Sequence, residues 1–183
     1  SITFLLAYPW GWAAQDLARG WAAQRADIAW ARGDTTGALA LDTEAIHAQE
    51  TPDGWLRLGD HARAAGEVTQ ALQAYRAAVA LQADYPPAVA HLGDMLRATG
   101  DLPGARRAFT PEDIGQQELT DWSWRVLTPV FTDTLVIGDG LDFGYVAGMY
   151  PAEVLQGVPA RWTDGRGLIR FGTPPAGSPP VAL

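Results

Sequence analysis

The feature that most constrains this chain is an internal repeat. Shifting the sequence against itself by 34 residues superimposes Leu58-Gly59-Asp60 on Leu92-Gly93-Asp94 and opens a run of eight identities within 17 residues. In repeats of this length each copy is one supersecondary unit, which buries its apolar face by stacking on its neighbours. The middle of the chain is therefore predicted to be a solenoid of stacked units.

Small and bulky residues within each copy indicate a pair of antiparallel helices. Gly59 and Gly93 are small where two helices approach closely, and Tyr75 and Phe109 fill the space between them. A degenerate copy lies upstream at a spacing of 33, with Asp42 in the aromatic position. The predicted helices cover residues 12–32, 36–48, 53–65, 69–82, 87–99 and 102–109.

This pattern resembles the tetratricopeptide repeat (TPR), a helix–turn–helix unit of about 34 residues. The positions that match the family are Trp55, Leu58-Gly59, Gly66, Ala71, Tyr75 and Ala78, and Ala62 departs from it by replacing a large aromatic. The resemblance implies a protein-interaction scaffold in which the first helix of each repeat lines a groove. The implied groove residues are Asp27, Trp30, Asp60, Arg63, Asp94 and Arg97.

Two interpretations of these groove residues stay open. Their arginines could bind the carboxylates of a peptide or of another protein chain. Alternatively, aspartate and arginine three residues apart on an exposed helix face form weak pairs that need no ligand. Because three repeats make a short groove, packing of the segment after Phe109 would also compete with an external peptide.

After Phe109 the pattern changes. Thr110-Pro111 begins a predicted capping helix that runs to about Val126. Strand-like runs follow at residues 134–137, 143–146, 161–163 and 167–171, and Asp164-Gly165 predicts a hairpin between the last two. We therefore expect an α+β chain with a helical domain at 1–110, a capping helix at 111–128 and a small antiparallel β unit with a Pro-rich tail at 129–183.

The last predicted strand, Leu168 to Phe171, is expected to have a covered edge, because native proteins rarely leave such an edge bare. Three neighbours could cover it: the apolar tail, the helix that carries Trp122 and Trp124, or a second chain.

Residues 115–175 also resemble the β region that follows tetratricopeptide repeats in some bacterial polytopic membrane glycosyltransferases. The motifs are Gly138 to Tyr145, Gly148 to Pro151 and Arg161 to Gly165. The resemblance implies a jelly-roll module in the cell envelope, extracytoplasmic and membrane-associated. It offers an alternative function, a carbohydrate-binding accessory region of a membrane-bound glycosyltransferase. Tyr145, Tyr150 and Trp162 could form the sugar-stacking platform, although aromatic residues on strands are most often core.

The start of the chain allows two interpretations as well. The apolar, aromatic run at residues 2–12 either packs into the core as part of an N-terminal helix or forms the exit end of a membrane helix, with its aromatic rings at headgroup depth. No stretch reaches the roughly 18 to 20 apolar residues that span a bilayer.

Composition excludes several chemistries. Cysteine is absent and all 13 basic residues are arginine, which rules out thiol and lysine Schiff-base catalysis. A net charge of −8 without a basic cluster argues against a nucleic-acid partner. Asp133, Asp139 and Asp142 could offer oxygens to calcium but lack the EF-hand spacing, so no metal is expected. We also expect no cofactor and no enzyme activity, because no nucleophile or phosphate cradle accompanies the acidic residues.

Overall fold

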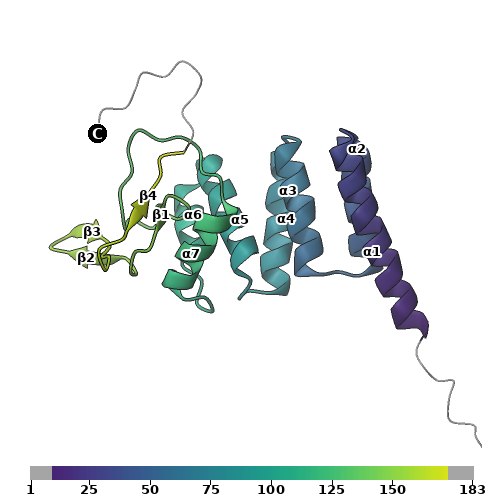
Figure 1. Cartoon of the computed structure of the whole chain (residues 1–183), viewed down its shortest axis with the longest axis horizontal. Coiled ribbons are helices and arrows are strands. Elements are labelled where there is room, and N and C mark those ends of the chain that lie inside the picture. Colours follow the sequence, from purple (N-terminus) through teal and green to yellow (C-terminus); the bar gives the residue numbers. More distant parts are fainter. Residues whose placement is uncertain (1–9, 173–183) are drawn as a thin grey trace, which may run out of the picture. The chain divides into compact units, whose positions relative to one another are not determined.

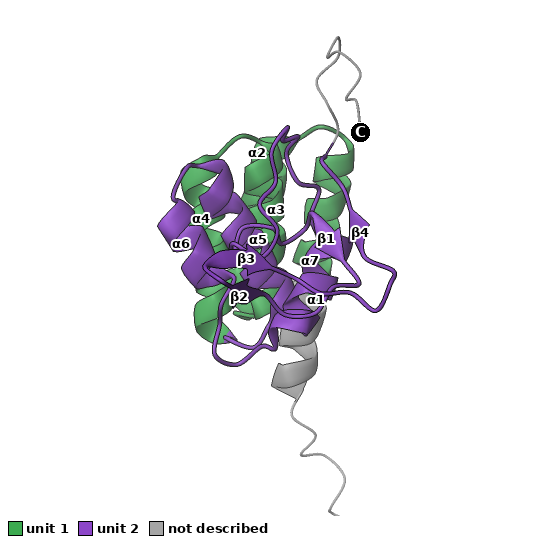
Figure 2. Ribbon diagram, turned by 90° about the vertical axis from the view of Figure 1, so that its left-hand side faces the viewer, with its two compact units in different colours: residues 1–81 green, residues 82–183 purple. Residues whose placement is uncertain are grey.

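The computed structural model describes the backbone of residues 10–172 and the side chains of residues 20–172. The side chains of the aromatic run at 2–12 and the tail from residue 173 lie outside the described residues. This described part holds seven helices and four short strands (Figure 1). It belongs to two compact units, residues 1–81 and 82–183 (Figure 2), so the division at residues 110 and 128 stays a prediction. No helix within the described residues is both long enough and apolar enough to cross a membrane.

Unit 1 consists of two helical hairpins that pack through α2 and α3. Its helices are α1 (Trp10–Ala31), α2 (Thr35–Ala48), α3 (Pro52–Ala64) and α4 (Val68–Leu81). Every boundary lies within two residues of the predicted one, because the repeat period and the capping residues both mark it.

Capping chemistry explains where these helices begin and end. The Thr51 side chain accepts a hydrogen bond from the Gly54 N–H at 3.1 Å and so begins α3, and Asp101 begins α6 (Leu102–Ala108) in the same way. The first helix of each repeat is followed by a glycine in the left-handed region, with φ of 82° at Gly66 and 85° at Gly100. Equivalent residues of the two repeats therefore share the same backbone conformation as well as the same amino acid.

The closest approach of the paired helices lies at two equivalent glycines. A Cβ atom added to Gly59 would lie 2.4 Å from the ring of Tyr75, and one added to Gly93 would lie 2.6 Å from the ring of Phe109. Both rings are fully buried. Each ring thus occupies the space that a side chain on the facing helix would need, which confirms the 34-residue register.

Unit 2 begins with one more hairpin, formed by α5 (Pro86–Ala98) and α6, and α7 (Gln116–Val126) packs against α5. The predicted start of α7 near Thr110 is wrong. The Thr110 hydroxyl donates to the carbonyls of Arg106 and Arg107, so this residue ends α6 instead of capping the next helix. Gly115, in an extended conformation, immediately precedes α7.

Four short strands complete the described part of unit 2. They are β1 (Val146–Ala147), β2 (Glu153–Leu155), β3 (Val158–Ala160) and β4 (Leu168–Ile169), paired antiparallel as β1 with β4 and β2 with β3. The strand expected at 134–137 does not form; Leu135 and Ile137 instead pack their side chains on a cluster around Val146. The hairpin expected at Asp164-Gly165 is also wrong, because β4 pairs with β1.

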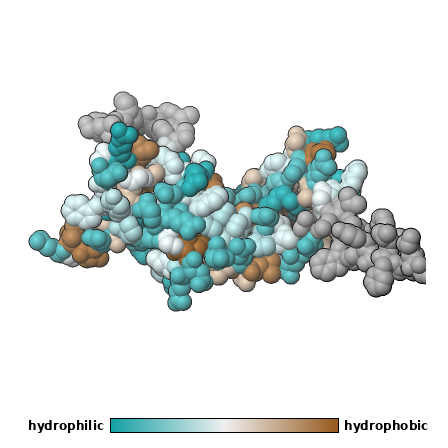
Figure 3. Space-filling view, turned by 60° about the horizontal axis from the view of Figure 1, so that its bottom comes forward, coloured by the Kyte–Doolittle hydropathy of each residue, from teal (hydrophilic) through white to brown (hydrophobic). Residues whose placement is uncertain are grey.

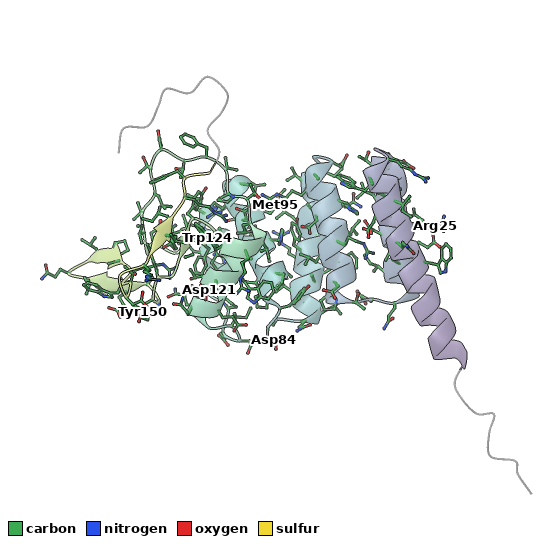
Figure 4. All side chains as sticks on the ribbon, viewed as in Figure 1. Arg25, Asp84, Met95, Asp121, Trp124 and Tyr150 are labelled. Carbon is green, nitrogen blue, oxygen red and sulfur yellow. The ribbon has the colours of Figure 1, made fainter. Side chains whose placement is uncertain are left out.

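The end of the predicted strand Leu168 to Phe171 contacts one segment that the sequence did not suggest and one, the helix that carries Trp124, that it did. The Thr132 N–H donates to the Phe171 carbonyl at 3.0 Å, so residues 130–132 run beside the end of this strand. From the same predicted strand Arg170 donates to the carbonyls of Trp124 and Leu127, and its guanidinium lies 4.3 Å from the Trp124 ring. The Trp124 side chain is labelled in Figure 4. The β region is therefore fixed to the end of α7.

A buried ion pair connects the loops of the β region. Arg161 makes two bonds to Asp142, Nε to Oδ2 at 2.6 Å and Nη2 to Oδ1 at 3.0 Å, and both side chains are fully buried. The Gly138 N–H donates to the same carboxylate at 2.8 Å, and Arg161 also donates to the Tyr150 carbonyl at 3.2 Å. These bonds satisfy charges that would otherwise be very costly to bury.

We predict that Gly93→Ala lowers the free energy of unfolding by about 1 to 3 kcal/mol, because the added methyl group must displace the buried ring of Phe109. Chemical denaturation measures the change. Gly20→Ala in α1 is the control, since its Cβ would meet nothing within 4 Å, and it should be neutral or stabilising by up to about 1 kcal/mol. Equal effects at both positions would contradict the packing described for Gly93.

We predict that Arg161→Met lowers the free energy of unfolding by about 3 to 5 kcal/mol, because it leaves the Asp142 carboxylate buried without its partner. A double variant with Asp142→Leu should be less destabilised than Arg161→Met alone, since it removes the unpaired charge as well. Arg166→Met, at an exposed arginine, serves as the control. The interpretation fails if Arg161→Met is as mild as this control.

Candidate functional site

The first helices of the three repeats carry the predicted groove residues. Each pair is three residues apart, so its two side chains share one helix face. The structure places Asp27 and Trp30 on α1, Asp60 and Arg63 on α3, and Asp94 and Arg97 on α5. Within these repeats the three pairs meet three different environments.

In unit 2 the chain's own loop occupies the face of α5. One nitrogen of Arg97 donates to the main-chain carbonyls of Leu141 and Phe143, the latter at 2.9 Å, and the other binds the buried carboxylate of Asp94. The guanidinium lies 4.6 Å from the Tyr145 ring. An exposed, weak Asp94–Arg97 pair is therefore the wrong interpretation: aspartate orients arginine, and arginine holds the loop.

The same loop is held from α6 as well. Arg106 donates to the carbonyl of Asp139 at 2.9 Å and to its carboxylate at 3.2 Å. Phe143 stacks on Phe109 with the ring centroids 4.6 Å apart. Intramolecular packing thus covers part of this face. A cleft of about 290 Å³ remains beside Arg97, between α5 and the segment that carries Val130.

In the second repeat, which lies in unit 1, the ring position holds Tyr75, whose hydroxyl group Phe109 lacks. The Tyr75 hydroxyl donates to Asp60 at 2.8 Å and also hydrogen-bonds Arg63. Burial, reinforced by the charge of Asp60, raises the pKa of the Tyr75 hydroxyl well above its usual value, so it stays a neutral donor. Phe109 has no hydroxyl, and Asp94 pairs with Arg97. Asp60 therefore has a tyrosine hydroxyl as a partner, whereas the ring of Phe109 offers Asp94 none.

The degenerate repeat replaces the ring with a buried carboxylate. Asp42 is fully buried, accepts a hydrogen bond from Arg57 Nε at 2.6 Å, and lies 2.6 Å from His61 Nδ1. Trp30 stacks on His61 with the ring centroids 4.6 Å apart. Sequence reasoning missed Arg57 and His61; the signal was Asp42 in an aromatic position, because a buried carboxylate requires cationic or donor partners nearby.

The three aromatic residues proposed as a glycan platform do not share one surface. Tyr145 is buried, its hydroxyl donates to the Val130 carbonyl at 2.8 Å, and burial raises its pKa against the opposing effect of Arg97. Tyr150 and Trp162 are more than half exposed and are joined by a hydrogen bond from the Tyr150 N–H to the Trp162 carbonyl. Only these last two residues form a surface feature.

The three aspartates considered for calcium have other partners. Asp142 binds Arg161, Asp139 binds Arg106 and the Leu141 N–H, and Asp133 accepts from the Thr134 hydroxyl. Across the part of the chain that the structure describes, no cluster of three or more histidine, aspartate or glutamate residues is placed to hold a metal ion.

A comparison with protein-family models agrees with the repeats described above. The tetratricopeptide-repeat family model matches residues 23–86 and 56–110. Among solved structures, the chain is similar to the Sgt2 TPR domain from Aspergillus fumigatus, with 23% sequence identity and a TM-score of 0.46. That match covers 50% of this chain and 61% of the other. No curated protein matches. The family match thus covers residues 23–110, slightly under half of the chain, and the 34-residue register and the glycine–ring contacts lie within it.

Proposed function

We propose that the chain is a non-catalytic protein-interaction scaffold of the cell envelope, and that a peptide binds to the faces of α1 and α3 in unit 1. Tetratricopeptide repeats bind protein or peptide partners, and this chain carries them over residues 23–110. The observation that carries the proposal is the way Arg97 binds main-chain carbonyls.

Arg97 provides an internal precedent for peptide binding. Its guanidinium donates to two main-chain carbonyls of a non-helical segment, and Asp94, one turn earlier on the helix, binds and orients it. Arg63 holds the equivalent position on α3, with Asp60 one turn earlier and Tyr75 beside both. A guanidinium carries five donors, so Arg63 can keep its partners within the unit and still donate to peptide carbonyls or to a carboxylate.

The neighbouring residues of unit 1 define the chemistry of the peptide. Asp27 is an exposed carboxylate suited to a basic side chain, and Trp30, held flat against His61, offers an apolar surface. A peptide that suits this face carries an acidic group for Arg63, an apolar side chain for Trp30 and a basic group for Asp27. Opposite charges at separate positions determine where along the face an extended peptide binds.

The test selects peptides from a random library on the immobilised full chain and measures their dissociation constants by fluorescence anisotropy. We predict that Arg63→Glu raises the dissociation constant about tenfold or more, because it places a negative charge opposite the peptide carbonyls or carboxylate. Arg76→Glu is the matched control, since Arg76 is an exposed arginine of the same unit on α4, and it should change little. The peptide site is not on α3 if both variants bind alike.

The envelope location rests on the resemblance of residues 115–175 and on the aromatic run at 2–12, which precedes the described side chains. Protease added to intact spheroplasts should digest the chain if it is exposed outside the membrane. A marker protein of the cytoplasm should survive the same treatment. Digestion only after lysis would contradict this part of the proposal.

A further inference from the structure

Exposed apolar side chains gather on the β2–β3 hairpin. Val154 is 71% exposed, Val158 62% and Leu155 40%, and Tyr150 and Trp162 flank the hairpin with more than half of their surface open. In Figure 3 apolar surface is visible at the left-hand end, where the hairpin lies. Leu155 and Val158 form a cross-strand pair on one face of the hairpin, and Val154 lies on the other face, so apolar side chains are exposed on both faces. Apolar side chains are costly to leave in water, which makes both faces of the hairpin suited to a partner.

The register shows which edge of the hairpin can accept another strand. Gln156 and Gly157 have φ of 52° and 84°, as in a two-residue turn, and Leu155 pairs with Val158 across it. The next pair, Val154 with Pro159, is then a non-hydrogen-bonded pair whose main-chain groups point outward. Proline has no N–H, so Pro159 blocks the β3 edge, whereas Val154 leaves a donor and an acceptor on the β2 edge.

Charge beside this edge indicates the kind of strand it suits. The Glu153 carboxylate accepts from Trp162 Nε1 at 3.2 Å, which places a negative charge next to an exposed aromatic ring. A carboxylate and an aromatic ring both attract a guanidinium or ammonium group. The net charge of −8 favours the approach of a basic partner from a distance.

We propose that the β2–β3 hairpin is a second partner surface, distinct from the repeats of unit 1. Its occupant is an extended segment of another protein that pairs with the β2 edge at Val154 and sets a basic side chain against Glu153 and Trp162. In this mode main-chain hydrogen bonds supply affinity, and alternate side chains supply specificity.

The test uses two fluorescein-labelled synthetic peptides of seven residues, each alternating valine with threonine. One carries a central arginine and the other a central glutamate. With the full chain, anisotropy should show the arginine peptide binding about fivefold more tightly, the effect of exchanging an attractive surface pair for a repulsive one. Glu153→Lys should reverse this preference, and Glu153→Gln should abolish it.

Variants of the edge separate strand pairing from simple charge attraction. Val154→Pro removes the outward N–H and should weaken binding of the arginine peptide about tenfold, whereas Val154→Thr keeps the N–H and should bind as the native chain does. Circular dichroism and melting temperature establish that each variant is folded. Arg63→Glu should leave peptide binding here unchanged, which distinguishes this surface from the one on α3.

Four results would overturn the proposal. The first is that neither peptide binds, and the second is that the preference for arginine survives Glu153→Lys. The third is a concentration-dependent dimer in light scattering that Val154→Pro abolishes, which would assign the edge to a second copy. The fourth is glycan-array binding lost in Trp162→Ala but kept in Val154→Pro, which would assign the surface to a sugar.

Discussion

The structure depends on one steric constraint, the contact between a glycine on one helix and an aromatic ring on its partner. At Gly59 and Gly93 the ring of the second helix lies where a Cβ atom would otherwise be. This contact sets the distance between paired helices and buries the largest side chains of each repeat. In the first repeat Ala26 and Asp42 take these two positions, and the carboxylate binds Arg57 and His61 of α3, the first helix of the next repeat. The same position on the second helix thus holds an aromatic ring in two repeats and a carboxylate in the first.

The two repeats that contain an aromatic ring differ in what their arginine contacts. With tyrosine, the hydroxyl engages both Asp60 and Arg63 and keeps them on the helix face. With phenylalanine, the equivalent arginine turns to the loop that follows the repeats and binds it. A difference of one oxygen atom therefore accompanies the change from a repeat that presents its arginine at the helix surface to a repeat that holds its own chain.

Local signals made the helices predictable, and the same signals are missing from the β region. Thr51 and Gly66 each act within a few residues, and the 34-residue register marks the equivalent positions of the next repeat, so the boundaries of the repeat helices follow from sequence. The strands are two or three residues long and can pair with distant residues, as Val146 does with Ile169, 23 residues later. Propensity alone cannot specify such pairings, which is why Asp164-Gly165 suggested a hairpin that forms at Gln156-Gly157 instead.

The sequence placed the six residues of the predicted groove at equivalent positions of α1, α3 and α5, but it did not indicate their environments. Nothing local to Arg97 indicates that residues more than forty positions later will bind it. The partners of Asp42 were unpredictable for the same reason, since they come from another helix of the unit. The positions of these residues on the helices thus followed from the sequence, whereas tertiary contacts determine which of the side chains stay at the surface.

The hydrogen bonds from Arg97 to the loop determine which sequence changes the loop can tolerate. The guanidinium binds carbonyl oxygens, which every amino acid provides, so Leu141 can be exchanged for other residues without loss of that bond. An insertion or deletion of one residue would instead move both carbonyls away from the donor. The loop should therefore tolerate change in the identity of its residues at such positions far better than change in its length.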